Sequence, residues 1–258
     1  MRSSLPPEFD EALTRAAGRL GIFSGEPLWF AEVSSTSDVA LTLAERGAGE
    51  GRLVIANVQS AGRGRHGRAW ASPAGAGLYL SAVLRPLPHA VPLLTIAAGL
   101  AVAGGIEAAT GLSPRLKWPN DIYIGDRKLA GMLAEAGADF VILGIGINVL
   151  PAAYPPDIAA RATSLEGELG RAVDRGLLLA ECLVSLAARY EGLQRGEAAA
   201  IVDAWRQRAA STLGRTVRWD AAGRAREGVA ENIDATGALI VRTSSGPVRL
   251  ISGEVQWI

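Results

Sequence analysis

The sequence has very few residues of the types that build disulfides and many catalytic sites. It contains one cysteine, Cys182, and two histidines, His66 and His89, in 258 residues. A single cysteine excludes an intrachain disulfide and favours a reducing compartment, so we expect a cytoplasmic protein. We expect Cys182 to lie in a helix core and the histidines to lie in loops.

Charge of one sign and a membrane-length apolar run are missing as well. Lysines plus arginines and aspartates plus glutamates number 26 each. A formal net charge of zero argues against a protein that binds nucleic acid through broad electrostatic attraction. The most apolar run, 91–106, is short for a membrane span and contains Pro92, so we expect a buried helix and no membrane partner. Residues 8–15 carry several charges, which excludes a signal peptide there.

Two lysines and an Asn-Asp pair come together in the most informative segment, 115–135. Lys117 and Lys128 lie on either side of Asn120-Asp121, and the turn Gly125-Asp126 separates the apolar segments 122–124 and 129–133. This pattern predicts a hairpin that holds two cations and a metal ligand on a rigid frame. Such a frame suits a nucleoside triphosphate or a carboxylate. Taken alone, the segment also fits a solvated charged hairpin.

Three arginines alternate with three glycines in a second segment, 59–70. The arginines are 63, 65 and 68, and the glycines are 62, 64 and 67. Arginine supplies forked donors to carboxylates and phosphates, and glycine permits close backbone approach, so we predict a flexible flap that closes on an anion. The glycines match G-x-G-x-x-G, but no helix is expected after them and no acidic residue follows about 20 positions on. A dinucleotide site is therefore rejected.

Together these segments resemble the biotin protein ligases. Further matches are Ser34–Ser37, Leu78–Ser81, the Gly-x-Gly-x-Asn strand end at 144–148, and Ser252–Val255. The resemblance implies an α+β fold: a catalytic domain with a mixed sheet like that of class II aminoacyl-tRNA synthetases over 1–210, then an SH3-like barrel over 211–258. Residues 1–27 are too few for the winged helix of the repressor members, so we expect the form without a DNA-binding domain.

Periodicity and punctuation predict the elements. Helices are expected at 7–19, 37–46 with Ser37 as cap, 91–109, 174–193 and 198–210. Strands are expected at 28–33, 52–58, 78–84 and 140–149, a loop around Pro151 and Pro155, and short barrel strands at 216–219, 226–233, 238–241, 248–251 and 255–258.

The resemblance also implies an activity and its residues. It implies an ATP-dependent ligase that adenylates biotin to biotinyl-AMP and transfers biotin to a lysine of a biotin carboxyl carrier protein, with Mg²⁺ as activator. The implied catalytic residues are Lys128 and Arg63. The implied biotin-binding residues are Ser35, Thr36, Ser37, Gln59, Arg63, Gly64, Arg65, Lys128, Gly131, Gly144 and Gly146. The implied ATP-binding residues are Arg63, Arg65, Lys117, Asn120, Lys128 and Asn148, with Asp121 as metal ligand. Ser37 stands where the family has asparagine.

Alternatives remain at this point. A lipoate–protein ligase shares the fold and the acyl-to-lysine chemistry, whereas a cysteine-dependent acyltransferase would need Cys182 in the site. A biotin-binding regulator and a catalytically idle biotin-binding module are further options. Trp118 is expected in the core, the place of Trp70 is open, and the oligomeric state is open between monomer and homodimer.

Overall fold

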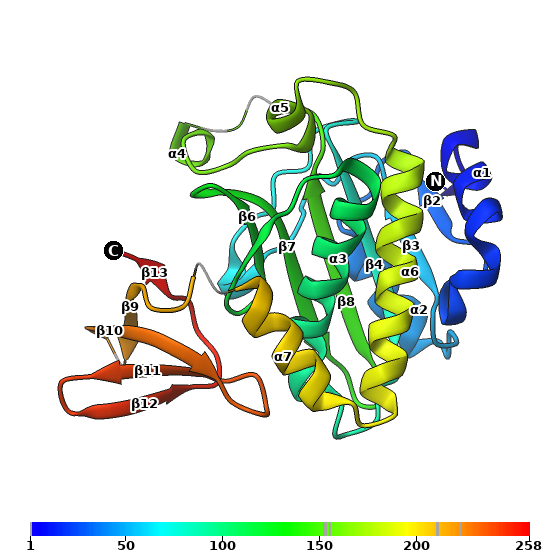
Figure 1. Cartoon of the computed structure of the whole chain (residues 1–258). Coiled ribbons are helices and arrows are strands. Elements are labelled where there is room, and N and C mark those ends of the chain that lie inside the picture. Colours follow the sequence, from blue (N-terminus) through cyan, green and yellow to red (C-terminus); the bar gives the residue numbers. More distant parts are fainter. Residues whose placement is uncertain (1, 152–153, 155, 210–211, 222) are drawn as a thin grey trace.

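The computed structural model describes residues 2–151, 154, 156–209, 212–221 and 223–258, so Pro155 of the predicted loop lies outside the described residues. An eight-stranded mixed sheet forms its centre, in the order β1-β2-β3-β4-β8-β7-β6-β5 (Figure 1). The strands are β1 (Arg2–Ser3), β2 (Leu28–Phe30), β3 (Leu53–Ala56), β4 (Gly77–Leu84), β5 (Arg115–Lys117), β6 (Asp121–Ile124), β7 (Arg127–Ala136) and β8 (Val141–Asn148). Strands β2 and β3 pair in parallel and the other neighbours are antiparallel.

Helices cover both faces of this sheet (Figure 1). The long helices α3 (Leu94–Thr110) and α6 (Arg175–Gln194) lie on one face, and α2 (Thr36–Glu45) packs on β3, β4 and β8 from the other. Helix α1 (Pro7–Ala16) packs on α6, and α7 (Ala198–Arg208) lies beside α3. The remaining helices are short: α4 (Pro156–Ala159), α5 (Leu165–Leu169) and the 3-10 turns η1 (Ala17–Arg19), η2 (Gly21–Phe23), η3 (Arg65–Gly67) and η4 (Val91–Leu93).

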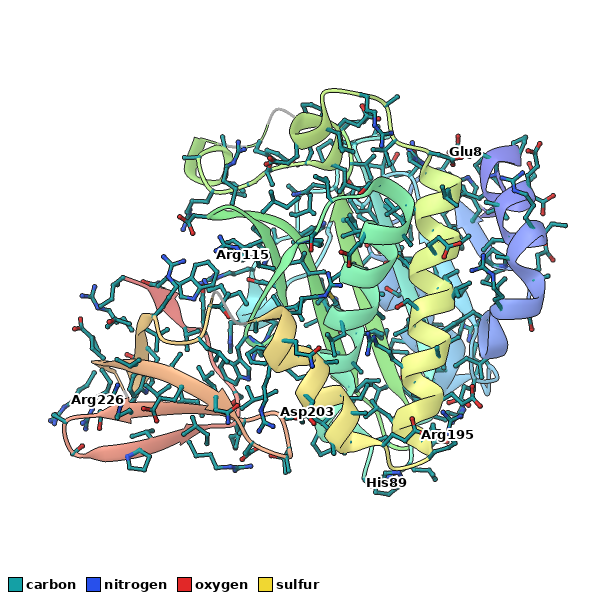
Figure 2. All side chains as sticks on the ribbon, in the orientation of Figure 1. Glu8, His89, Arg115, Arg195, Asp203 and Arg226 are labelled. Carbon is teal, nitrogen blue, oxygen red and sulfur yellow. The ribbon has the colours of Figure 1, made fainter. Side chains whose placement is uncertain are left out.

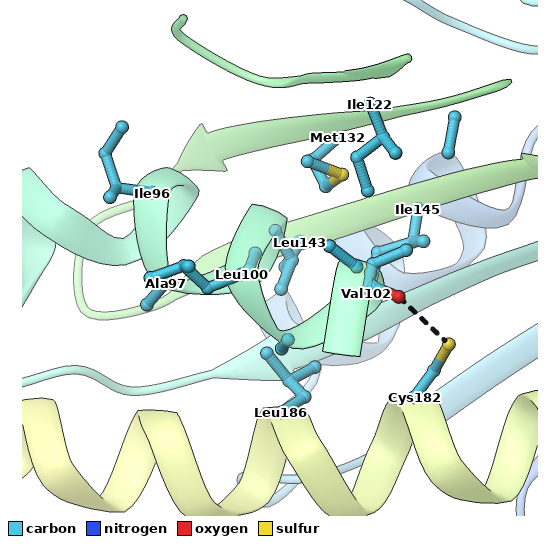
Figure 3. Close-up of a cluster of buried hydrophobic side chains, with 14 of the residues drawn as sticks. Ile96, Ala97, Leu100, Val102, Ile122, Met132, Leu143, Ile145, Cys182 and Leu186 are labelled. Atoms are coloured by element: carbon cyan, nitrogen blue, oxygen red, sulfur yellow. Dashed lines mark hydrogen bonds between the residues drawn. The ribbon is translucent and has the colours of Figure 1, made fainter. Parts of the chain in front are cut away.

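The main core lies between α3, α6 and the sheet (Figure 3). Helix α3 is apolar around most of its circumference, and Gly105 lets it approach α6: a Cβ there would lie 2.5 Å from the Cα of Cys182. Cys182 is buried beside the Val102 carbonyl, and burial raises the pKa of its thiol to about 12. The predicted core position of Cys182 is therefore confirmed.

The C-terminal segment forms a separate antiparallel sheet of five strands, in the order β12-β11-β10-β9-β13. The strands are β9 (Thr216–Ala221), β10 (Arg224–Ile233), β11 (Leu239–Thr243), β12 (Gly246–Leu250) and β13 (Gln256–Trp257). This is the SH3-like unit, and with the mixed sheet it confirms the predicted α+β class. Labelled charged side chains such as Glu8, Arg195 and Arg226 lie at the periphery (Figure 2).

The predicted elements are found with shifted ends. The expected helix at 91–109 is α3 with its preceding 3-10 turn; it is long and apolar enough to cross a bilayer, but 67% of that window is buried inside the protein. The predicted cap of α2 was wrong. The cap is Ser35, whose hydroxyl accepts from the Ser37 amide, because the helix begins at Thr36.

Candidate functional site

A cavity of about 140 Å³ lies where the first turn of α2, strands β7 and β8, the glycine-arginine loop and the last loop of the SH3-like unit meet. Its lining contains most of the predicted site residues: Thr36, Ser37, Gln59, Arg63, Gly64, Arg65, Lys117, Asn120, Asp121, Lys128, Gly131, Gly144 and Gly146. Segments that are far apart in the sequence thus line one cavity. Both of the strongest motifs, 59–70 and 115–135, contribute residues to its lining.

Positive charge is concentrated in this lining. Five lysines and arginines (63, 65, 68, 117 and 128) stand against two carboxylates, Asp121 and Glu254. The Lys128 ammonium lies 2.7 Å from Asp121 Oδ1, and Arg65 donates to Asn120 Oδ1 at 3.3 Å. The excess of cations makes the cavity suited to an anionic ligand, because forked and point donors both stabilise carboxylate and phosphate oxygens.

Burial lowers the pKa of two of these cations. It lowers the pKa of Lys117, against the opposing pull of Asp121 and Glu254, and it lowers the pKa of Arg65 for the same first reason. Burial alone would raise the pKa of Glu254, but the Arg68 ion pair and the nearby lysines outweigh it, so that pKa falls. These cations are partly desolvated, and an arriving anion would therefore be held more strongly than at an open surface.

One end of the cavity is lined by hydroxyl groups and an amide. Thr36 and its neighbour Ser37 begin α2, and the Ser81 hydroxyl of β4 lies 2.8 Å from Thr36 Oγ1 and 3.1 Å from Ser37 Oγ. Gln59 Oε1 accepts from both the amide and the hydroxyl of Thr36, and Gln59 Nε2 donates to Ser72. Each group is buried or half-buried, so the set offers oriented polar contacts away from bulk water.

Two glycines of adjacent strands give the cavity its width. A Cβ on Gly146 of β8 would lie 2.5 Å from the Trp70 ring, and one on Gly131 of β7 would lie 3.2 Å from Trp70 and from the Lys128 chain. Trp70 therefore rests on the bare backbone of both strands. Its Nε1 is buried, with no hydrogen-bond partner within the described part of the chain. Trp70 thereby covers the backbone of both glycines on the cavity side.

The glycine-arginine loop is tied to three elements. Arg63 pairs with Asp38 of α2 at 3.0 Å and with Glu135 of β7 at 2.8 Å. Arg65 donates to the Gly253 carbonyl at 3.0 Å, and Arg68 to Glu254 at 2.9 Å. Arg63 and Arg68 therefore already have protein carboxylates as partners, and closure of the loop on an anion stays a prediction.

Two predicted residues lie beside the cavity and not in its lining as the described residues define it. Ser35 is buried as the cap of α2. Asn148, at the end of β8, donates its amide to the Thr163 carbonyl at 2.9 Å. Trp118 is buried in the main core, as expected, and donates to the Gly237 carbonyl at 2.8 Å, but it also lines the cavity.

Two lining residues that were not predicted as site residues, Glu254 and Val255, enter from the SH3-like unit. Trp70, Met132 and Leu133, which lie within the two predicted motifs, add apolar surface. Ser81 stands behind the lining and carried no signal beyond its place in the Leu78–Ser81 match. The Gly-Glu pair at 253–254 belongs to the Ser252–Val255 match, but no spacing along the chain indicates that it meets Arg65 and Arg68.

The donor set for a metal ion is small. No group of three or more His, Cys, Asp or Glu side chains gathers anywhere within the described residues. Asp121 pairs with Lys128 at 2.7 Å and Glu254 pairs with Arg68, so the cavity lining offers two carboxylates, each beside one cation. This fits Mg²⁺, which typically binds one or two carboxylates and takes its other ligands from phosphates and water.

Comparisons with known proteins agree with this geometry. Residues 29–149 match the model of the biotin/lipoate A/B protein ligase family, and residues 212–257 match that of the biotin protein ligase C-terminal domain. A biotin–[acetyl-CoA-carboxylase] ligase of Mycobacterium tuberculosis is 36% identical over 98% of this chain and 97% of that protein. The bifunctional ligase/repressor BirA of Bacillus subtilis is 34% identical over 97% of this chain and 80% of that protein. The solved structure of a biotin protein ligase from Aquifex aeolicus, in complex with biotin and ATP, superposes with a TM-score of 0.81 at 30% identity, covering 90% of this chain and 98% of that one.

Proposed function

This chain belongs to the biotin/lipoate A/B protein ligase family, as a biotin protein ligase, and from that premise we propose how its cavity performs the reaction. It is an ATP-dependent enzyme that joins biotin to AMP and then transfers biotin to a lysine of a carrier protein. The observation that carries the assignment of roles is the excess of lysines and arginines over carboxylates in the cavity lining, together with a cavity end lined by hydroxyl groups.

The first step brings two anions together. A biotin carboxylate oxygen attacks the α-phosphorus of ATP, the bond to the β-phosphate breaks, and pyrophosphate leaves. Lys128 and Arg63 stabilise the charge that develops on the reacting oxygens, because preorganised donors act most strongly where charge appears. Arg65, Lys117 and Asn120 hold the triphosphate, and Asn148 orders the strand end behind them.

The second step needs a dry site. The ε-amine of the acceptor lysine attacks the acyl carbon of the mixed anhydride, AMP leaves, and the amine loses a proton. Water would hydrolyse the same anhydride, so the glycine-arginine loop has to cover it. Trp70 lies on Gly131 and Gly146 in this closed arrangement, and it would cover the bound adenylate after moving outwards.

The biotin end is assigned to the hydroxyl-lined part of the cavity. Thr36, Ser37 and Gln59 contact the biotin head, with Ser35 holding the start of α2. Gly64, Gly131, Gly144 and Gly146 give the bound molecule close backbone approach. Asp121 would hold Mg²⁺, and the ion, when bound, screens the charge of the triphosphate.

The proposal also covers the partner and the location. The acceptor is a biotin carboxyl carrier protein or domain of a biotin-dependent carboxylase, and the enzyme acts in the cytoplasm. A homodimer remains a prediction. We also place the domain boundary between 210 and 211: α7 ends at Arg208 and β9 begins at Thr216.

Intact mass spectrometry tests the proposed function. The chain is incubated with ATP, Mg²⁺, a carrier domain, and either biotin or lipoate. We expect the mass of one biotin on the carrier and none of lipoate. Labelling by lipoate alone would assign the chain to the lipoate ligases, and binding of biotin without labelling would make it a binding module.

A further inference from the structure

Thr36, Ser37, Ser81 and the Gln59 amide form a cluster of hydrogen bonds, here called the hydroxyl cluster. The direction of every hydrogen bond in it is fixed by one backbone amide. The Thr36 N–H can only donate, so the Gln59 atom that lies 2.8 Å from it is the carbonyl oxygen Oε1. That sets the orientation of the whole Gln59 amide. Its Nε2 consequently donates to Ser72 Oγ at 2.9 Å, and the Ser72 hydroxyl donates in turn to the Trp70 carbonyl at 3.2 Å.

The hydroxyl protons follow from the same starting point. Thr36 Oγ1 lies 3.1 Å from the same Gln59 oxygen. A carbonyl oxygen has no proton to donate, so the Thr36 hydroxyl is the donor of this hydrogen bond. A hydroxyl has one proton. Thr36 therefore accepts from Ser81 at 2.8 Å, and Ser81, its proton used, accepts from Ser37 at 3.1 Å. The order is Ser37 to Ser81 to Thr36 to Gln59.

This order decides what the cavity offers a ligand. Thr36 and Ser37 line the cavity, whereas Ser81 is fully buried behind them. Both lining hydroxyls have used their protons inwards and present lone pairs, and the second hydrogen of Gln59 Nε2 is the donor that remains. Gly144 keeps this surface open, because a Cβ there would lie 3.0 Å from Ser37 Oγ.

We propose that Ser81 is a positioning residue that sets Thr36 and Ser37 as hydrogen-bond acceptors and thereby selects a urea head group. A cyclic urea has two N–H donors and one carbonyl acceptor, which complements two hydroxyl acceptors and one amide donor. A dithiolane ring has no N–H group and would leave buried acceptors unpaired, the kind of mismatch that discriminates strongly. This inference rests on the proposed biotin ligase function.

The test compares Ser81→Ala with Thr110→Val. Both remove a buried hydroxyl; that of Thr110 donates to the Ile106 carbonyl, accepts from the Leu112 amide and is not in the cavity lining. Without the Ser81 hydroxyl, Thr36 no longer accepts a hydrogen bond from it, and the Ser37 hydroxyl can rotate and donate into the cavity. We expect the KM for biotin to rise about tenfold in Ser81→Ala, the size of one misdirected hydrogen bond, with kcat within about twofold. Thr110→Val should retain both values.

A biotin analogue with one ureido N–H replaced by a ring oxygen supplies the second readout. The wild type should discriminate against it by about tenfold or more in kcat/KM, and Ser81→Ala should discriminate less, because a rotated Ser37 can donate to the ring oxygen. Ser81→Cys keeps a hydrogen-bonding group at this position, slightly larger and with a weaker donor, and should fall between, which covers a poorly folded alanine variant.

Different results separate the two claims. A wild type that does not adenylate biotin defeats the proposed function itself. A wild type that does, together with Ser81 variants of unchanged KM and unchanged discrimination, overturns the role of Ser81 alone. A fall in kcat with unchanged KM and discrimination also overturns it, since that pattern does not come from the head-group contact.

Discussion

At the scale of single residues, the site depends on charges that the protein itself only partly neutralises. Lys128 faces Asp121 at 2.7 Å and lies over the Trp70 ring at 5.4 Å. Both contacts leave its ammonium beside the cavity, where the reacting oxygens of biotin and ATP are proposed to meet. A preorganised cation of this kind matters more in the transition state than in the ground state.

Lys128→Ala should therefore lose about 3 kcal/mol or more of transition-state stabilisation, which is about a 100-fold or greater loss in the adenylation rate. Cys182→Ala is the matched control, since the thiol is buried against Val102 in the core and not in the cavity lining. Single-turnover formation of the adenylate measures both. A slow Cys182 variant beside an active Lys128 variant would indicate acyl transfer through a thiol.

The hairpin and loop motifs could be predicted from the sequence, because their charged residues and glycines are close together along the chain. Glu254 and Ser81 could not be assigned in that way. Glu254 reaches the site through the packing of the SH3-like unit against the loop, and Ser81 acts through the hydroxyls of another element. Such long-range contacts leave no periodic pattern in the sequence.

At the scale of elements, the glycine-arginine loop is the part whose order is most finely balanced. Its Arg63 and Arg68 pairs are between partly exposed groups, and such pairs contribute about 0–1 kcal/mol each. Ordering a backbone costs about 1–2 kcal/mol per residue. The ion pairs therefore do not hold the segment 62–68 closed by themselves.

We predict that this loop exchanges its amide hydrogens rapidly in the empty enzyme and slowly with biotin and a non-hydrolysable ATP analogue. Hydrogen exchange across 60–70 is the measurement. Arg65→Gly removes the contact to Gly253 and should release the adenylate faster, so that lysines of unrelated proteins become labelled. Equal, strong protection with and without ligand would show a preformed loop instead.

The turn between β10 and β11 gives a pH prediction. Burial alone would raise the pKa of Asp234, but the Arg249 guanidinium and the hydroxyl and amide of Thr236 outweigh it and hold that pKa at about 2. A lowered folded-state pKa stabilises the fold above the unfolded value and loses that contribution as pH falls through the folded one. Asp234→Asn should therefore show a smaller fall in Tm than the wild type between pH 5 and about 2. An identical fall in Tm in the variant and the wild type would show that Asp234 does not contribute to this pH dependence.

The element ends show why sequence reasoning was right about type and wrong in detail. Serines at 35 and 37 both suit a helix cap, and only the folded backbone reveals that Ser35 accepts the Ser37 amide. The strand β5 and the helix α5 were missed because three and five residues are too few for a periodic pattern. Helix α6 was predicted well, because its apolar positions repeat over 20 residues.

At the scale of the whole molecule, the SH3-like unit takes part in the site. The ring of Trp257 in β13 contacts that of Tyr123 in β6 in a tilted arrangement, with centroids 5.1 Å apart. The Lys117 ammonium lies 4.8 Å from the Trp257 ring and 5.2 Å from the Tyr123 ring. Two aromatic faces thus hold a lysine that lines the cavity. The C-terminal unit positions a proposed phosphate ligand of the catalytic domain.

Trp257→Ala should accordingly raise the KM for ATP about twofold to fivefold, which corresponds to the loss of a cation–π contact of about 0.5–1 kcal/mol. The KM for biotin should stay near the wild-type value. Ile258→Ala, the neighbouring exposed residue, is the control. Steady-state kinetics with each substrate varied in turn decides the matter, and an equal rise in both KM values would indicate general loosening of the interface.

The central claim is that one cavity activates biotin with ATP. Biotin-dependent exchange of labelled pyrophosphate into ATP, measured with the wild type and with Lys128→Ala, tests it most directly, because the reversal of adenylation needs no carrier protein. The account predicts exchange with biotin, none with lipoate or without an acid, and a loss of about 100-fold or more in the variant. Exchange with lipoate but not biotin, or exchange that survives Lys128→Ala unchanged, would contradict it.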